Sequence, residues 1–180
     1  MKKFLIMCIA VMSFNLSAKE VNNDNGIIEF FFYGCPHCLH MDNKMKYWRN
    51  QNKEVSYEKV PVVFNELMKK AAKHYYVSKM LNIEEEFSHA YYRELNDKNK
   101  YISDELAIEV MSNFSKKEAI LKAMKSKMIN TKINDAEELA QKHSVLVFPT
   151  FIINGGKKLN ASNSGGHEGL INEINKIFEK

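Results

Sequence analysis

The sequence has few cysteines, with only three among its 180 residues, at positions 8, 35 and 38. Small exported proteins that depend on disulfides for stability carry several spaced cysteine pairs. Cys35 and Cys38 could close only a very short loop, and closing so short a loop stabilises a fold little. The chain is therefore not a disulfide-stapled scaffold, and the pair is better explained by chemistry than by structure.

A strong net charge is also lacking. The formal charge is +4 at pH 7, and it would fall to +2 without Lys2 and Lys3. So balanced a composition argues against nucleic acid as a partner. The run Lys116–Lys127 contains five lysines, which we interpret as a solvated helix face. Internal repeats and low-complexity tracts are not evident.

Long apolar runs are missing as well, apart from one near the start. Phe4–Phe14 is shorter than the roughly 20 residues that a membrane-spanning helix needs. It follows the positive stretch Met1-Lys2-Lys3 and precedes the small residue Ala18, which is the layout of a secretory signal peptide cut before Lys19. An acylated Cys8 or a retained anchor is a less favoured alternative. Cleavage would leave 162 residues, enough for one domain with a proper core.

The pattern of apolar residues indicates an α/β protein. Strands are predicted at 27–33, 55–64 and 145–153, and Asn154-Gly155-Gly156 predicts a hairpin turn into 157–159. Helices are predicted from about 35, over 65–80, 84–95 and 104–114, from a capping box at Ser115 and Glu118, from Asn134 to His143, and near 170–178. The order is β-α-β, a block of helices, then β-β-α, which implies a sheet with a helical insertion. The expected division is a signal peptide at 1–18, a first half at 19–64, the insertion at 65–131 and a second half at 132–180.

The cysteine pair falls at the start of a predicted helix. Cys38, Met41, Met45 and Trp48 lie on one face of this helix, and Pro36 fits its first turn. Unpaired backbone N–H groups and the helix dipole stabilise a thiolate at Cys35, which should therefore react with substrate. Cys38 should be its buried partner, and His37 can add positive charge or a hydrogen bond.

Three other interpretations of the pair were weighed. Zinc requires four ligands, and the two cysteines with His37 and His40 are too crowded to form a tetrahedron alone. A c-type haem requires histidine directly after the second cysteine, where Leu39 stands. An inert structural disulfide remains possible in principle. The spacing and its context favour a redox pair.

The segment EFFFYGCPHC, from Glu29 to Cys38, resembles the active-site segment of the DsbA family. Phe148-Pro149-Thr150-Phe151 is similar to that family's cis-proline loop, and the order of elements also matches. The resemblance implies a thioredoxin fold with a helical insertion. It also implies an enzyme of the periplasm that introduces disulfide bonds into exported proteins, with the redox-active Cys35–Cys38 disulfide and no other cofactor.

The same resemblance implies roles for individual residues. Pro149 would follow a cis peptide bond and, with Phe148, bind an extended substrate strand. Glu29 matches an acidic residue beneath the active site, Asp42 a second acidic position, and Lys59 a lysine facing the buried acid. Two residues depart from the family pattern. Gly34 replaces a bulkier residue, and Phe148 stands where Val or Thr is more usual, which could narrow the substrate groove or alter the redox potential.

The resemblance also implies partners. These are unfolded exported proteins with free thiols and a DsbB-like, quinone-linked membrane protein that reoxidises the enzyme, and the protein is expected to be a monomer without metal. The alternatives are a disulfide isomerase or reductase with dedicated clients, and a peptide- or metal-binding module in which the pair is vestigial. Residues 19–26 leave no room for an N-terminal dimerisation domain of the kind that isomerases use.

One charge in the first predicted strand needs its own explanation. Glu29, Phe31 and Tyr33 share a strand face, so Glu29 should point beneath the active site. A buried carboxylate there would have a raised pKa and could accept the proton of Cys38. The alternative is a glutamate that Lys59 merely neutralises. The five histidines outside the Cys-Pro-His-Cys segment are expected on the surface or at helix ends: His40, His74, His89, His143 and His167.

Overall fold

A computed structural model of the chain describes residues 25–97 and 100–179. The expected signal peptide at 1–18, and Cys8 within it, lie outside these residues. Among the helices of the described part, none is long and apolar enough to cross a membrane.

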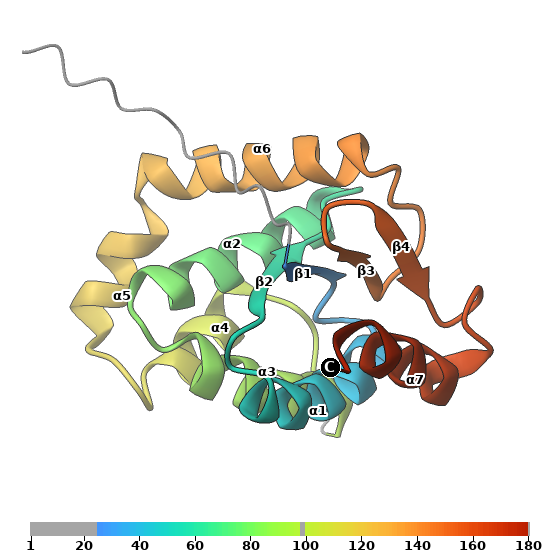
Figure 1. Cartoon of the computed structure of the whole chain (residues 1–180). Coiled ribbons are helices and arrows are strands. Elements are labelled where there is room, and N and C mark those ends of the chain that lie inside the picture. Colours follow the sequence, from blue (N-terminus) through green and yellow to red (C-terminus); the bar gives the residue numbers. More distant parts are fainter. Residues whose placement is uncertain (1–24, 98–99, 180) are drawn as a thin grey trace, which may run out of the picture.

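A four-stranded mixed sheet forms the centre of the molecule (Figure 1). Its strand order is β2-β1-β3-β4; β1 is parallel to β2 and antiparallel to β3, and β3 is antiparallel to β4. The strands are β1 (Gly26–Phe31), β2 (Ser56–Pro61), β3 (Thr150–Ile153) and β4 (Lys157–Asn160). Every residue of β1 is buried, as expected for a central strand with an almost continuous apolar run. Pro61 ends the edge strand β2, where its missing N–H is tolerated.

Seven helices complete the described part. They are α1 (Pro36–Gln51), α2 (Glu66–Met80), α3 (Glu84–Asn96), α4 (Asp104–Met111), α5 (Lys117–Met124), α6 (Lys127–Lys142) and α7 (Gly166–Phe178). The predicted order of β-α-β, helical insertion and β-β-α is thus confirmed. Because α6 runs without a break across the expected boundary after residue 131, we propose that the inserted block extends to Lys142.

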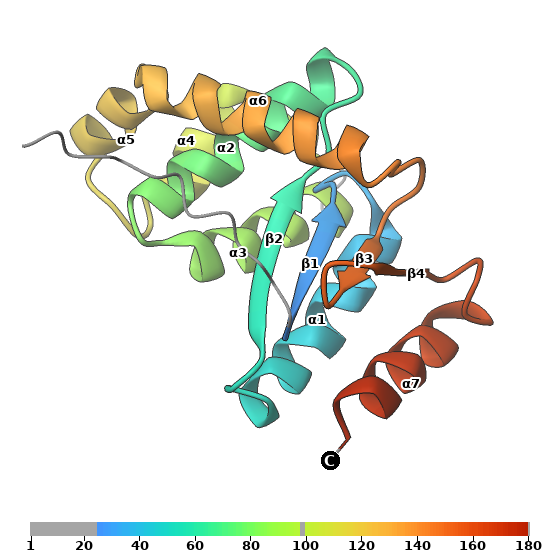
Figure 2. The same cartoon turned by 45° about the horizontal axis from the view of Figure 1, so that its top comes forward.

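Helices cover both faces of the sheet (Figure 2). On one face, Met41 and Met45 of α1 pack with Leu170 and Ile174 of α7 against Ile27 and other strand residues. On the other, Ile129, Ile133 and Ala136 of α6 belong to the larger apolar core. The predicted apolar face of α1 is therefore confirmed, since Cys38, Met41, Met45 and Trp48 are all buried.

Three local predictions were wrong. α5 begins at Lys117 without a side-chain cap, because the Ser115 N–H donates to the Met111 carbonyl at 2.9 Å and so completes the end of α4. Asn134 does not start a helix but lies inside α6, whose buried residues on the sheet side continue through this point. The strand predicted at 145–153 begins only at Thr150, because the preceding residues form the loop that carries Pro149.

His74 is fully buried, which contradicts its expected place on the surface. From α2 it reaches two other helices, with Nδ1 3.0 Å from the Tyr91 hydroxyl and Nε2 2.8 Å from the Asp104 carboxylate. Burial lowers the pKa of His74 to about 4, although Asp104 opposes this shift. The neutral ring therefore links α2, α3 and α4, and no periodic pattern in the chain indicates a buried polar residue at this position.

We expect this histidine to make the fold sensitive to acid. The unfolded chain binds a proton at His74 below its ordinary pKa of 6.5, whereas the folded protein does so only near 4. Stability must therefore fall as the pH drops across this window, by about 2 kcal/mol between pH 7 and about pH 5. Urea unfolding at several pH values should show that His74→Gln lacks this part of the loss. His89→Gln, at an exposed histidine on α3, should retain it; equal slopes in the two variants would contradict the assignment.

Candidate functional site: a thiol pair at the start of α1

The two cysteines lie where the chain turns from β1 into α1. The Cys35 N–H donates to the Phe32 carbonyl at 3.1 Å, which closes the turn, and Cys35 then acts as the N-cap of α1. Its sulfur accepts a hydrogen bond from the Cys38 N–H at 3.3 Å. Pro36 occupies the first position of the helix. Both cysteines are free thiols, with Cys35 6% exposed and Cys38 fully buried, so Cys35 is the sulfur that a substrate can reach.

The pKa values of the two thiols move in opposite directions. A hydrogen bond from the Cys38 thiol lowers the pKa of Cys35 to about 6; the backbone N–H groups of Cys38 and His37 and the charge of His37 add to the shift, and burial opposes it. Burial raises the pKa of Cys38 well above its ordinary value, and its hydrogen bond to Cys35 acts in the same direction. At neutral pH the pair therefore consists of a Cys35 thiolate and a Cys38 thiol.

The loop before β3 approaches Cys35 from a distant part of the chain. The Phe148–Pro149 peptide bond is cis, as the resemblance implies. The Phe148 carbonyl lies 3.7 Å from the Cys35 sulfur. Beside it is a hollow of about 160 Å³, which reaches from His37 and Pro149 to Asn160 and His167. The cis-proline loop and this hollow therefore lie beside the reactive sulfur.

The two departures from the family pattern are connected through Phe32. The Phe148 ring packs edge-on against Phe32, with 5.9 Å between the ring centroids, and lies 6.3 Å from the ring of the half-exposed Phe64. A Cβ at Gly34 would lie 2.5 Å from the Phe32 ring. The Phe32 ring thus fills the space that a bulkier residue at position 34 would occupy, and it supports Phe148.

Glu29 is fully buried and its hydrogen-bond partner is not the expected lysine. The hydroxyl of Tyr57 donates to Glu29 Oε2, while Oε1 has no hydrogen-bond partner. Lys59 stands opposite Glu29 in the parallel register of β1 and β2, but its ammonium group forms an ion pair with Asp42. Burial raises the pKa of Glu29, although the Lys59 charge and the Tyr57 hydrogen bond favour the ionised form.

Three histidines gather near the cysteines, which the sequence did not indicate. The His167 ring, at the start of α7, lies 5.0 Å from the His37 ring and 4.9 Å from the His40 ring, measured between centroids. Burial and these two neighbours lower the pKa of His167. No group of three or more His, Cys, Asp or Glu side chains in residues 25–97 and 100–179 is arranged to hold a metal ion.

The predicted site residues therefore fall into three places. Cys35, Cys38, Pro36 and His37 lie together at the start of α1, Phe148 and Pro149 lie against Cys35, and Glu29, Asp42 and Lys59 form a buried charged group behind Cys38. Tyr57, Phe32 and His167 were not predicted as site residues. Strand alternation could have found Tyr57, since it lies two residues before Lys59 on the same strand face. Phe32 and His167 gave no signal of their own.

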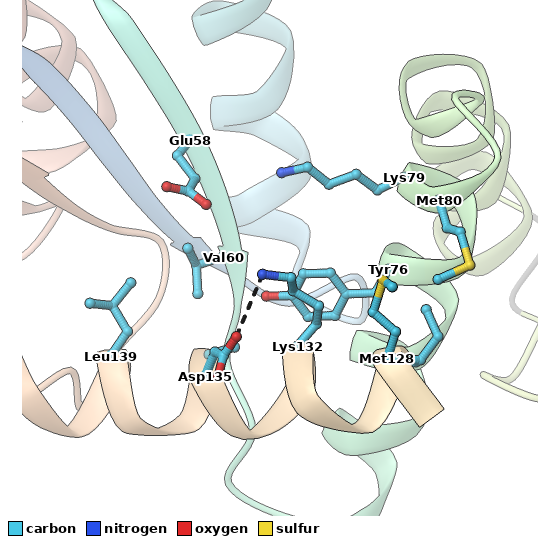
Figure 3. Close-up of a pocket in the computed structure, with 11 residues that line it drawn as sticks. Glu58, Val60, Tyr76, Lys79, Met80, Met128, Lys132, Asp135 and Leu139 are labelled. Atoms are coloured by element: carbon cyan, nitrogen blue, oxygen red, sulfur yellow. Dashed lines mark ion pairs between the residues drawn. The ribbon is translucent and has the colours of Figure 1, made fainter. Parts of the chain in front are cut away.

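A separate cavity of about 290 Å³ lies between β2, α2 and α6 (Figure 3). Apolar side chains such as Val60, Met128 and Leu139 line it together with Tyr76, and the Lys132–Asp135 ion pair stands at its edge. Val60 alternates with Lys59 along β2, so this cavity opens on the sheet face opposite to the buried charged group. It carries no cysteine and none of the predicted site residues.

Comparison with known proteins places this geometry among thiol–disulfide enzymes. The sequence profile of the family described as "Thioredoxin" matches residues 20–173. The chain is 25% identical over 157 residues to the thiol:disulfide interchange protein DsbA of Pseudomonas syringae pv. tomato, covering 86% of this chain and 73% of that one. It is 22% identical to DsbA of Pseudomonas aeruginosa, with 86% and 74% covered.

Solved structures share the fold. A crystal structure of a Pseudomonas aeruginosa DsbA variant superposes with a TM-score of 0.81 at 21% identity, covering 87% of this chain and 86% of that one. A Proteus mirabilis DsbA variant that holds a non-covalently bound peptide, PWATCDS, superposes with a TM-score of 0.73 at 18% identity, with 87% and 90% covered. The predicted thioredoxin-type α/β fold is confirmed.

The low pKa of Cys35 can be tested directly. In the reduced protein, alkylation by iodoacetamide should rise with pH around a midpoint near 6, and well below it the rate should fall tenfold per pH unit because only the thiolate reacts. Cys38→Ala removes the thiol that donates to Cys35 and should raise this midpoint by about one unit. Cys35→Ser should abolish the low-pH reaction. A midpoint near 9, the ordinary value, would contradict the assignment.

The contact between Gly34 and Phe32 predicts a double-mutant effect. Gly34→Ala should lower the free energy of unfolding by about 1–3 kcal/mol, because its Cβ would overlap the Phe32 ring. In a Phe32→Leu background the same change should cost less, because the ring is gone. Gly156→Ala is the matched control, since its Cβ would meet nothing within 4 Å. Urea unfolding measures all four variants, and equal costs in both backgrounds would show that the two residues are independent.

Proposed function

Because the chain belongs to the thioredoxin family and is a DsbA-like thiol:disulfide oxidoreductase, we propose that it introduces disulfide bonds into exported proteins through its Cys-Pro-His-Cys site. The observation that carries this proposal is the unequal pair of thiols, with the pKa of Cys35 at about 6 and that of Cys38 well above its ordinary value. Stabilising a thiolate in the reduced protein makes the corresponding disulfide an oxidant.

The proposed reaction begins with a Cys35–Cys38 disulfide. A client thiolate attacks the sulfur of Cys35, the bond between the two cysteines breaks, and Cys38 leaves with the electron pair and takes up a proton. A second client thiolate then attacks the client sulfur of the mixed disulfide and releases the Cys35 thiolate. The client loses two electrons and gains a disulfide, while the protein is left with a Cys35 thiolate and a Cys38 thiol.

Phe148 and Pro149 are proposed to hold the client strand beside Cys35. The Phe148 carbonyl lies 3.7 Å from the Cys35 sulfur, and a hollow of about 160 Å³ beside it could take a side chain of the client. The peptide bound to the Proteus mirabilis DsbA variant contains a cysteine, which supports an analogous mode here. His37 would stabilise the Cys35 thiolate, and Pro36 would fix the first turn that presents it.

Glu29 is proposed to exchange the proton of Cys38. Its charge is close enough to raise the pKa of that thiol, and burial raises its own pKa, which favours uptake of a proton by the carboxylate. Lys59 and Asp42 would support it by adjusting the local charge. Attraction to Glu29 and Asp42 outweighs burial and raises the pKa of Lys59, so the lysine stays positive.

The place of action and the second partner follow from the same proposal. Residues 1–18 have the layout of a signal peptide, which would deliver the protein to the periplasm. A DsbB-like, quinone-linked membrane protein would return the pair to the disulfide by the reverse exchange. The protein would act as a monomer, on clients that arrive unfolded with free thiols.

Replacing the reactive cysteine tests the proposal. Cys35→Ser should reduce oxidation of a reduced, unfolded client to the rate without protein, because no sulfur can then receive the client thiolate. Cys38→Ser should also lose client oxidation, because without Cys38 no Cys35–Cys38 disulfide can form for the client thiolate to attack. Client disulfides are followed by thiol trapping and mass spectrometry. Undiminished client oxidation by Cys35→Ser would refute the enzymatic proposal.

The redox equilibrium with glutathione distinguishes an oxidant from a reductant. At equilibrium with a glutathione buffer, the Cys35–Cys38 pair should be more readily reduced than glutathione disulfide, because the reduced form is stabilised. A pair that stays oxidised in strongly reducing buffer would instead favour a dedicated reductase.

A further inference from the structure

The hydrogen bond from Tyr57 to Glu29 assigns a role to a residue outside the thiol motif. We propose that Tyr57 is the positioning residue of the buried acid: its hydroxyl holds Oε2 of Glu29, so that Oε1 is the oxygen that exchanges a proton with Cys38. The inference rests on the proposed function, in which Glu29 is the proton acceptor. Tyr57 adds the control of which oxygen reacts and at what pH.

The two oxygens of Glu29 have different surroundings. Oε2 accepts the Tyr57 hydroxyl, whereas Oε1 is buried without a hydrogen-bond partner. An unpaired buried carboxylate oxygen is costly, so it persists mainly where function requires it. Because Tyr57 already occupies one lone pair of Oε2, Oε1 is the oxygen with both lone pairs free to receive a proton from Cys38.

Two other donors act near Glu29: the Tyr92 hydroxyl of α3, which is buried and forms no hydrogen bond to the acid, and Lys59, which is engaged elsewhere. The Lys59 ammonium is paired with Asp42 and lies 4.5 Å from the centroid of the Phe31 ring. It acts on Glu29 as a nearby charge and not as a hydrogen-bond donor. Because Glu29 lies in β1 and Tyr57 in the adjacent β2, the register of the sheet sets their distance.

Arg49 packs over the Tyr57 ring. Its guanidinium carbon lies 4.9 Å from the ring centroid, a cation–π contact between α1 and β2. Tyr57 as a residue is half-buried and packs against the core around α1 and α7. Through the contact of Arg49 with Tyr57 and the hydrogen bond of Tyr57 to Glu29, the last turns of α1 are connected to the carboxyl group.

The charges around Glu29 explain why a donor is needed. Lys59 from β2 and Arg49 from α1 favour the carboxylate, whereas Asp42 from α1 disfavours it and burial disfavours it most. A proton acceptor must be ionised at the moment when Cys38 gives up its proton. The Tyr57 hydroxyl stabilises that ionised form.

The step that depends on Tyr57 is resolution of a mixed disulfide at Cys35. Cys38 gives its proton to Oε1 of Glu29, and its thiolate attacks the sulfur of Cys35. The bond between Cys35 and the bound thiol breaks, and that thiol leaves as a thiolate with the electron pair. The step is a disulfide exchange, so no further oxidant is required.

The test uses glutathione as the bound thiol. The reduced protein is mixed with oxidised glutathione, the reaction is stopped in acid, and mass spectrometry follows the glutathione adduct as Cys38 resolves it over a range of pH. The resolution rate should rise with pH as Glu29 ionises, and the pH at the midpoint of this rise is the quantity measured. Tyr57→Phe should raise this midpoint by about one pH unit, since a hydrogen bond to a charged group is lost. At pH values below both midpoints the variant should be about tenfold slower, and the difference should shrink at high pH.

Two control variants separate positioning from general effects on the fold. Tyr75→Phe removes another buried hydroxyl, which donates to the backbone carbonyl of Lys59 at 2.9 Å, and it should leave the midpoint unchanged. Glu29→Gln should remove the pH-dependent limb, and adding Tyr57→Phe to it should then change nothing further. An unshifted midpoint in Tyr57→Phe, or an additive effect in the double variant, overturns the proposal.

A second measurement does not involve client oxidation. The carboxyl carbons of the glutamates are labelled with ¹³C, and NMR follows the pKa of Glu29 in the reduced protein, assigned by its loss in Glu29→Gln. Tyr57→Phe should raise this pKa, whereas 3-fluorotyrosine at position 57, a stronger donor of the same shape, should lower it. Equal values in all three proteins overturn the role of Tyr57. If Cys35→Ser still oxidised clients while these shifts were observed, the proposed function would fail and the hydrogen bond would stand.

Discussion

A thiolate at Cys35 requires hydrogen-bond donors directed at its sulfur, and this requirement accounts for the local path of the chain. β1 ends at Phe31, a single turn closed by the Phe32 carbonyl follows, and α1 begins at once with Cys35 as its N-cap. The Cys38 N–H then points at the sulfur at 3.3 Å. A longer connection would move the sulfur away from the end of the helix, where the dipole and free N–H groups act.

The same short turn forces the two thiols into different environments. One helical turn separates them, so that when Cys35 lies at the mouth of the site, Cys38 must enter the core between α1 and the sheet. Burial then raises the pKa of Cys38, while its thiol lowers that of Cys35 through their hydrogen bond. The hydrogen bond between the thiols therefore lowers the pKa of Cys35 and raises that of Cys38 at the same time. Two groups whose pKa values are separated in this way can take different protonation states at one pH.

The sequence predicted the parts of this site that depend on neighbouring residues. The buried strand, the helix that starts at the cysteines and the place of Pro36 all follow from short-range periodicity and helix-end chemistry. The capping box at Ser115 used the same kind of signal and was wrong, because the backbone of that serine completes α4 instead. Tyr57, Phe32 and His167 were missed for a different reason. Strand alternation places Tyr57 on the same face as Lys59 but does not show its hydrogen bond to Glu29. The ring contacts of Phe32 with Phe148 and of His167 with His37 join distant parts of the chain, and one sequence does not report such contacts.

Side chains alternate in direction along β1 and into the turn after it, so that the surroundings of Glu29 and those of Phe148 lie on different sides. Glu29 and Phe31 point to the side of the sheet where Tyr57 and Lys59 lie. There the Tyr57 hydrogen bond and the Lys59 charge oppose the rise that burial causes in the pKa of Glu29. Phe32, one position out of phase with them, packs against Phe148 on the substrate side and excludes any side chain at Gly34. A change in the substrate wall can therefore occur without disturbing the acid, because adjacent residues point to opposite faces. Phe148 is accommodated by Phe32 and Gly34, while Glu29, Asp42 and Lys59 stay grouped on the other side of the strand.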